Sequence, residues 1–213
     1  KKFFKEWALK NTFYLVTGSD LPKLQEQMDG LEIYSKGIFT CCGNQHWNLD
    51  TGNINTSIDL VYENKFELPK HLNMFLDVIL KQSPYPHRYG NHMEDRGSMV
   101  NFSIVGRDCT QEQREHFFEW DNEKQERVKI ANIIKTKAKG IDAVIGGQIS
   151  IDIYPEGNDK SQILKHIDYD ECNFIGDRTK EGGNDYPLAK LMKETDNCYT
   201  FQTTGWEQTQ EIL

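Results

Sequence analysis

Short apolar runs alternate with amphipathic segments at both ends of the chain. At the start, residues 1–10 carry apolar side chains on one helical face, residues 12–16 form an apolar run typical of a buried strand, and residues 21–28 are expected to form a helix. Near the other end, the pattern predicts a short helix at 160–167, strands at 173–175 and 198–202, a helix at 186–193 and a terminal helix from Gly205. Such alternation is typical of a parallel α/β sheet.

The middle of the chain follows a different, strand-rich pattern. It predicts short strands between 46 and 58 around a turn at 50–53, a helix at 68–81, a strand at 99–105, one long charged helix from 111 to about 137, and a strand over 143–154 with a glycine interruption. We therefore expect an α/β core domain formed by residues 1–58 and 159–213, with an α+β cap domain inserted at 59–158.

The net charge and the cysteine pattern limit which kinds of binding partner and which compartment the chain suits. The chain has 213 residues and a net charge of −8, with a pI near 5.3, which disfavours a general nucleic-acid or anionic membrane surface. An anionic substrate would need a local basic cluster. No apolar run approaches the length of a membrane span. The five cysteines fit neither a metal motif nor a disulfide framework, which indicates reduced thiols and a cytoplasmic location.

A glycine-rich turn between two aspartates follows one of the predicted strands. The strand at 173–175 ends just before Asp177, and the turn at 182–184 leads to Asp185. Two carboxylates at a strand end can meet on Mg²⁺, which prefers oxygen ligands and often shares them with a substrate phosphate. The alternative is a polar turn with one solvated and one helix-capping aspartate.

Three further residues could take part in phosphoryl transfer. Lys160 opens a predicted helix and could neutralise charge on a reacting phosphate, or it could be an ordinary surface lysine. Thr17 and Ser19 follow the strand at 12–16, where hydroxyl groups and free backbone N–H groups suit a phosphoryl oxygen. Ser19 or Asp20 could equally cap the next helix.

Polar residues in the middle block could bind an anionic substrate. Ser150 and Asp152 lie two residues apart in a predicted strand, so they share the face opposite the neighbouring isoleucines. Arg96, Arg107 and Arg114 form the local basic cluster of an acidic chain, and a guanidinium fork suits phosphate. A wet strand face and solvated surface arginines are the alternative interpretation.

Taken together, these segments resemble eukaryotic-type phosphomannomutases of the haloacid dehalogenase (HAD) superfamily. The resemblance spans nearly the whole chain and rests on residues 16–20, 106–114, 146–160 and 176–185. It implies a Rossmann-like core with an inserted cap, use of Mg²⁺, and interconversion of mannose 6-phosphate and mannose 1-phosphate through an aspartyl-phosphate and a hexose bisphosphate. It also implies a homodimer through the cap.

The resemblance assigns a role to each candidate residue. Lys160 matches the core lysine, Asp177 and Asp185 match the metal-side acidic residues, and Ser19 with its neighbours matches the second core motif. Thr17 stands where many relatives have glycine. The residues that match the cap ligands of the distal phosphate and sugar hydroxyls are Arg96, Arg107, Arg114, Ser150 and Asp152.

One part of the family pattern is missing. The nucleophile and the acid/base residue of the family lie in an Asp-x-Asp-Gly-Thr motif after the first strand, and residues 1–40 contain no such motif. We therefore expect the nucleophile upstream of Lys1. The competing hypotheses are a sugar-phosphate phosphatase of the same superfamily and a truncated or degenerate relative that binds phosphates without turning them over.

Overall fold

The computed structural model describes residues 1–50 and 57–213, which form two compact units. Unit 1 contains residues 1–64, 158–181 and 185–213, and unit 2 contains residues 65–157 and 182–184. The expected boundary at residues 58/59 falls inside strand β4, and the whole of β4 belongs to unit 1. The residues of the expected turn at 51–53 lie outside the described part of the chain.

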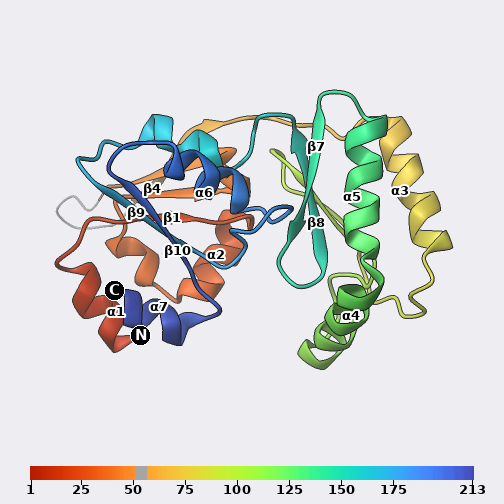
Figure 1. The fold of residues 1–213 in the computed structure, drawn as a ribbon, viewed down its shortest axis with the longest axis horizontal. Coiled ribbons are helices and arrows are strands. Elements are labelled where there is room, and N and C mark those ends of the chain that lie inside the picture. The colour runs from red at the N-terminus through yellow and green to blue at the C-terminus, as the bar shows by residue number, and fades with distance from the viewer. Residues whose placement is uncertain (51–56) are drawn as a thin grey trace. The chain divides into compact units, whose positions relative to one another are not determined.

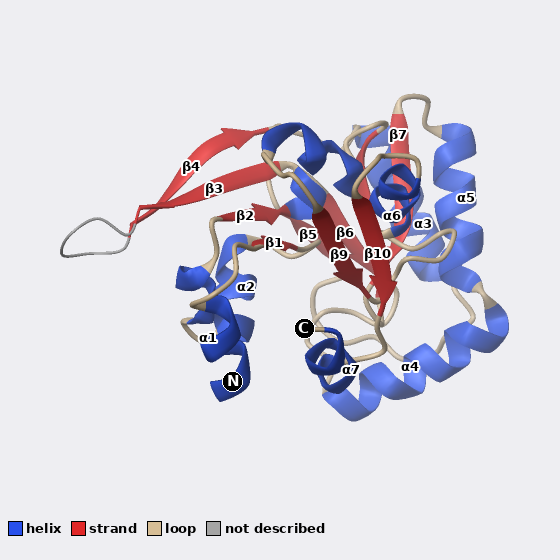
Figure 2. Cartoon of the chain, turned by 60° about the vertical axis from the view of Figure 1, so that its left-hand side comes forward, coloured by secondary structure: helices blue, strands red, loops and turns tan. Residues whose placement is uncertain are grey.

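Unit 1 contains two sheets and the helices that cover them (Figure 1). The first has the order β1-β2-β3-β4, with β1 and β2 parallel and the remaining pairs antiparallel; the second is the parallel pair β10-β9. Figure 2 shows β3 and β4 running side by side as a long ribbon. The strands are β1 (Tyr14–Val16), β2 (Gly37–Thr40), β3 (Gln45–Asp50), β4 (Ser57–Glu63), β9 (Cys172–Gly176) and β10 (Cys198–Gln202).

The two sheets of unit 1 share one hydrophobic cluster. In this cluster Val16 of β1, Phe39 of β2 and Phe174 of β9 pack with residues of two later helical segments, among them Ile163 and Leu188. The helical elements are α1 (Lys2–Ala8), α2 (Leu21–Met28), α6 (Tyr186–Lys193), α7 (Trp206–Ile212) and the 3-10 turns η1 (Leu31–Tyr34), η2 (Cys41–Gly43) and η3 (Lys160–His166). Among the described residues, β1 pairs with one strand, β2. Likewise, β9 pairs with one strand, β10.

Unit 2 is a four-stranded antiparallel sheet with helices on one face (Figure 1). The strand order is β5-β6-β8-β7, and Leu76, Ile130 and Ile134 of the helices pack with Phe102 and Ile151 of the sheet. The elements are α3 (Lys70–Gln82), β5 (Met93–Asp95), β6 (Val100–Ser103), α4 (Gln111–Lys124), α5 (Glu126–Lys137), β7 (Ile141–Gly146) and β8 (Ser150–Pro155).

The single helix predicted over 111–137 is wrong, because the chain breaks into α4 and α5 at Gln125. Gln125 has a left-handed backbone with φ of 55°. Asp121 stabilises the break, since its carboxylate accepts hydrogen bonds from the backbone N–H of Arg127 at 3.0 Å and from its Nε at 2.7 Å. The same guanidinium contacts the backbone carbonyls of Gly146, Gly147 and Ser150, each at 3.3 Å. This buried pair therefore ties the helices to the β7–β8 turn.

The single strand predicted over 143–154 is also wrong. The glycine interruption is a reversal of chain direction, and β7 and β8 pair as an antiparallel hairpin with Gly146 opposite Ser150. Gly147, in the connection, has φ of 40°, a region that glycine enters without a steric penalty. In the described ranges, no helix combines the length and apolar character needed to cross a bilayer.

Candidate active site

The carboxyl end of β1 carries the first candidate residues, Thr17 and Ser19. The Thr17 hydroxyl accepts a hydrogen bond from the backbone N–H of Ser19 at 3.1 Å. Asp20 is the N-cap of α2, because its carboxylate accepts from the N–H of Lys23 at 3.1 Å. The capping role left open between Ser19 and Asp20 therefore falls to Asp20, and Thr17 stabilises the turn through its own hydroxyl.

A strained turn follows the neighbouring strand, β2. Cys41 and Cys42 are fully buried and both have left-handed backbones, with φ of 52° and 59°. Such conformations cost on the order of 1–3 kcal/mol in non-glycine residues and cluster at functional sites. The backbone N–H of Cys41 donates to the carbonyl of Ser19 at 2.9 Å, and the Cys42 carbonyl accepts from the Gln162 side chain at 3.2 Å. The turn thus links Ser19 to η3, which begins at Lys160.

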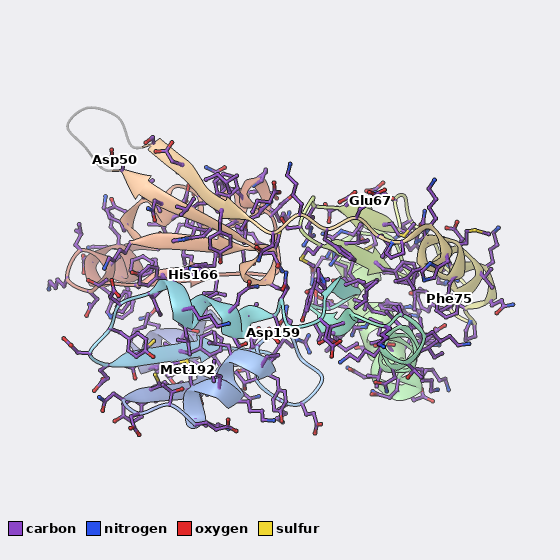
Figure 3. All side chains as sticks on the ribbon, turned by 90° about the horizontal axis from the view of Figure 1, so that it is seen from above. Asp50, Glu67, Phe75, Asp159, His166 and Met192 are labelled. Carbon is purple, nitrogen blue, oxygen red and sulfur yellow. The ribbon has the colours of Figure 1, made fainter. Side chains whose placement is uncertain are left out.

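Lys160 and Asp185 form a buried ion pair. The ammonium Nζ lies 2.5 Å from Oδ1 of Asp185, and the two residues are 5% and 3% exposed. Asp159, labelled in Figure 3, caps the 3-10 turn that carries the lysine by accepting from the N–H of Ser161 at 2.8 Å. Lys160 is therefore not an ordinary surface lysine.

The other carboxylate oxygen of Asp185 fixes the turn after β9. Oδ2 accepts a hydrogen bond from the backbone N–H of Arg178 at 3.0 Å. A Cβ atom at Gly176 would lie only 2.8 Å from this oxygen, so a glycine is needed for the close approach. Asp185 thus joins the end of β9 to Lys160.

The pKa of Asp185 lies below its ordinary value. Burial alone would raise it, but the attraction and hydrogen bond of Lys160, together with the backbone N–H groups of Arg178 and Asp177, lower it further than burial raises it. A depressed folded-state pKa contributes stability above the unfolded-state value, near 3.8, and that contribution is lost as the pH falls through the folded value.

We therefore expect acid to remove part of the stability of unit 1. The melting temperature should fall as the pH drops below about 4, and it should fall less steeply in Asp185→Asn, which has no carboxyl group to protonate at this position. Differential scanning calorimetry from pH 6 to pH 2.5 checks this. An equally steep decline in the variant would show that other carboxyl groups dominate acid unfolding.

Asp177 differs from Asp185 in its surroundings. Its side chain is 64% exposed and lies 3.8 Å from the Nε of Arg178. An exposed carboxylate after a strand suits Mg²⁺, which takes oxygen ligands. In the part of the chain that the structure describes, no three His, Cys, Asp or Glu side chains are grouped to hold a metal ion. Of the two aspartates predicted to meet on Mg²⁺, Asp185 is engaged by Lys160 and by the backbone N–H of Arg178, and Asp177 is the one whose carboxylate is accessible.

Two of the candidates in unit 2, Ser150 and Asp152, lie on the face of its sheet opposite the helices. Ile151 and Ile153 of β8 point into the hydrophobic core, as the alternation predicts, and Ser150 and Asp152 take the other face. The alternative of a solvent-exposed strand face is wrong, because Ser150 and Asp152 are both buried. The Asp152 carboxylate accepts hydrogen bonds from the side-chain amides of Asn101 at 2.7 Å and Asn184 at 3.2 Å.

The three candidate arginines lie close to one another. The pKa of Arg107 is lowered, first by burial and then by the positive charges of Arg96 and Arg114, while Glu94 and Asp152 act in the opposite direction. Arg114 also donates a hydrogen bond to the backbone carbonyl of Arg107 at 3.4 Å. The structure therefore brings Arg107 within electrostatic reach of Arg96, Arg114 and Asp152.

Sequence reasoning missed three polar residues of this face. Glu94 contacts two of the arginines, and Asn101 and Asn184 orient Asp152. Asn101 stands opposite Asp152 in the β6–β8 pairing, so a correct pairing of these strands would have found it. No local signal distinguishes Glu94 from the many other acidic residues.

The chain is similar in sequence to known phosphomannomutases. Residues 1–212 match the family "Eukaryotic phosphomannomutase". A phosphomannomutase from Drosophila melanogaster is 33% identical over 192 residues, which cover 87% of this chain and 76% of the relative.

Solved structures show the same fold at low sequence identity. A haloacid dehalogenase-like hydrolase from Bacteroides thetaiotaomicron has a TM-score of 0.56 and 13% identity, over 99% of this chain and 90% of that chain. A HAD subclass IIB sugar phosphatase has a TM-score of 0.51 and 12% identity, over 93% and 84%. The fold is thus the HAD-type α/β fold with a cap, and the chain belongs to the eukaryotic phosphomannomutase family.

Proposed function

We propose that this chain is the main part of an enzyme that interconverts mannose 6-phosphate and mannose 1-phosphate through an aspartyl-phosphate and a hexose bisphosphate. Unit 1 is the catalytic core and unit 2 the cap. The observation that carries the proposal is the clustering around Arg107: it shares an oxygen of Glu94 with Arg96, its backbone carbonyl accepts a hydrogen bond from Arg114, and it interacts electrostatically with Asp152. A site that binds a phosphate beside sugar hydroxyls needs both kinds of group.

In the core, Lys160 neutralises charge on the reacting phosphate and Asp185 holds the lysine in place. Their buried, hydrogen-bonded pair supports this division of roles, because an ammonium fixed in a dry site needs little reorganisation during reaction. Of the two metal-side aspartates, we take the exposed Asp177 as the direct ligand and Asp185 as the group that reaches the metal side only through Lys160. Ser19, after β1, is the proposed contact to a phosphoryl oxygen. Mg²⁺, when bound, supplies further charge neutralisation on phosphate oxygens.

The nucleophile comes from a segment outside these 213 residues. No Asp-x-Asp-Gly-Thr motif occurs in the chain, and a phosphoryl transfer through an aspartyl-phosphate requires that carboxylate. Among the described strands, β1 pairs with β2 in one sheet and β9 pairs with β10 in another. Side chains of β1 and β9 nevertheless belong to the same hydrophobic cluster. A further parallel strand between β1 and β9, with the aspartates at its carboxyl end, accounts for this split sheet.

The substrate-binding role of the cap is tested by Arg107→Ala. Removal of a charge-assisted hydrogen-bonding group costs about 1.5–3 kcal/mol, so the Kd for mannose 6-phosphate should rise by roughly 10- to 100-fold. Isothermal titration calorimetry measures the change. The melting temperature should shift little, since the guanidinium is not part of the hydrophobic core. Lys139→Ala, which removes an exposed positive charge of the same unit, is the matched control. Equal affinities for Arg107→Ala and wild type would contradict the assignment.

A further inference from the structure

Glu94 lies within the arginine cluster of unit 2, and the roles proposed above do not include it. It belongs to β5, and one of its carboxylate oxygens lies 2.5 Å from the guanidinium of Arg96 and 3.3 Å from that of Arg107. A single carboxylate oxygen therefore bridges two of the three arginines.

Burial makes this bridge energetically important. The side chains of Arg96 and Arg107 are 3% and 19% exposed, and that of Glu94 is 35% exposed. Like charges in such partly desolvated surroundings repel more strongly than in water. Of the charged groups that act on Arg107, Glu94 has the largest influence and favours the charged guanidinium, while Arg96 and Arg114 oppose it. Glu94 thus offsets the mutual repulsion of the arginines, and its carboxylate lies between the guanidinium groups of Arg96 and Arg107.

The carboxylate also affects any phosphate that binds the arginines. It is an anion within hydrogen-bond distance of the groups that would hold the phosphate, so it competes for them and repels the incoming charge. Asp152 adds a weaker contribution of the same sign. A bare cluster of three arginines would bind phosphate more tightly and release it more slowly.

We propose that Glu94, by occupying Arg96 and Arg107 with its carboxylate, limits how tightly the arginine cluster binds phosphate. The inference rests on the proposed function in taking phosphate as the ligand class. It adds a specific consequence for turnover: the phosphorylated sugar must leave the cap after reaction, and a moderate affinity permits that release.

Inorganic phosphate binding to the full chain tests the inference. Glu94→Gln keeps the shape of the side chain and removes its charge, so it should bind phosphate about tenfold more tightly than wild type. The gain should disappear in an Arg96→Ala/Arg107→Ala background, which removes both arginines that Glu94 contacts and so distinguishes the cap from any phosphate site in unit 1. Asp95→Asn is the matched control, because it removes an exposed charge from the same strand and should leave the affinity within about twofold.

Circular dichroism and thermal melting establish that each variant is folded, and Glu94→Ala, which removes the same charge, replaces Glu94→Gln if the latter is unfolded. Unchanged or weaker phosphate binding by the folded variant, with clear binding by wild type, would overturn the role of Glu94 alone. Absence of binding by wild type to both inorganic phosphate and mannose 6-phosphate would overturn the proposed function together with it.

Discussion

Replacing Arg127 with methionine is expected to lower the free energy of unfolding by about 3–5 kcal/mol. The substitution leaves the Asp121 carboxylate buried without its partner, and the side chains of the pair are only 3% and 5% exposed. It also removes the donor to the carbonyls of Gly146, Gly147 and Ser150. Because these carbonyls belong to the β7–β8 turn, the loss should loosen the hairpin that carries Ser150 and Asp152.

Urea unfolding followed by circular dichroism measures this effect. Lys135→Met on the same helix is the matched control, because its ion pair with Asp142 is partly exposed and should contribute less than about 1 kcal/mol. The double variant Arg127→Met/Asp121→Leu should recover much of the loss, since it removes the uncompensated carboxylate. A loss below 1 kcal/mol for Arg127→Met would mean that the pair does not stabilise the break between α4 and α5.

Replacing Lys160 with methionine is expected to reduce kcat by roughly 100- to 1,000-fold in the protein that includes the nucleophile segment. The substitution removes the ammonium that neutralises the reacting phosphate. It also leaves Asp185 as a buried carboxylate without its partner, at a cost of about 3–5 kcal/mol in stability. The two effects have different causes and can be separated.

The double variant Lys160→Met/Asp185→Asn separates them. Without the buried charge it should regain stability, but it should remain inactive because the ammonium is still absent. Lys165→Met, an exposed lysine on the same 3-10 turn, is the control and should be close to wild type in both properties. Recovery of activity by the double variant would show that Lys160 has a structural role only.

The sequence pattern predicted well where the signal lay within a few neighbouring residues. The alternation in β8 correctly separated Ser150 and Asp152 from the isoleucines, since a strand fixes the face of each side chain. The break at Gln125 was not predictable in this way, because glutamine carries no turn signal and the Asp121–Arg127 pair that stabilises the break forms only in the folded chain.

Contacts distant in sequence explain the remaining differences at the site. The sequence predicts Asp185 to be a helix-capping or metal-side residue. Its ion pair with Lys160 was not predictable, because the lysine lies 25 positions away. Glu94 sits only two residues from Arg96, but its contact with Arg107 depends on the fold of unit 2. Residue types and spacing thus singled out the arginines and the core lysine as candidates, and the tertiary structure supplied their partners.

The most direct test of the central claim follows phosphorus by ³¹P NMR. Two proteins, one beginning at Lys1 and one that includes the preceding coding sequence, are incubated with mannose 1-phosphate, Mg²⁺ and a hexose bisphosphate primer. We predict that the longer protein converts mannose 1-phosphate to mannose 6-phosphate until the two reach equilibrium, and that the 213-residue chain leaves it unchanged. Release of inorganic phosphate without isomerisation by the longer protein, or isomerisation by the shorter one, would contradict this account.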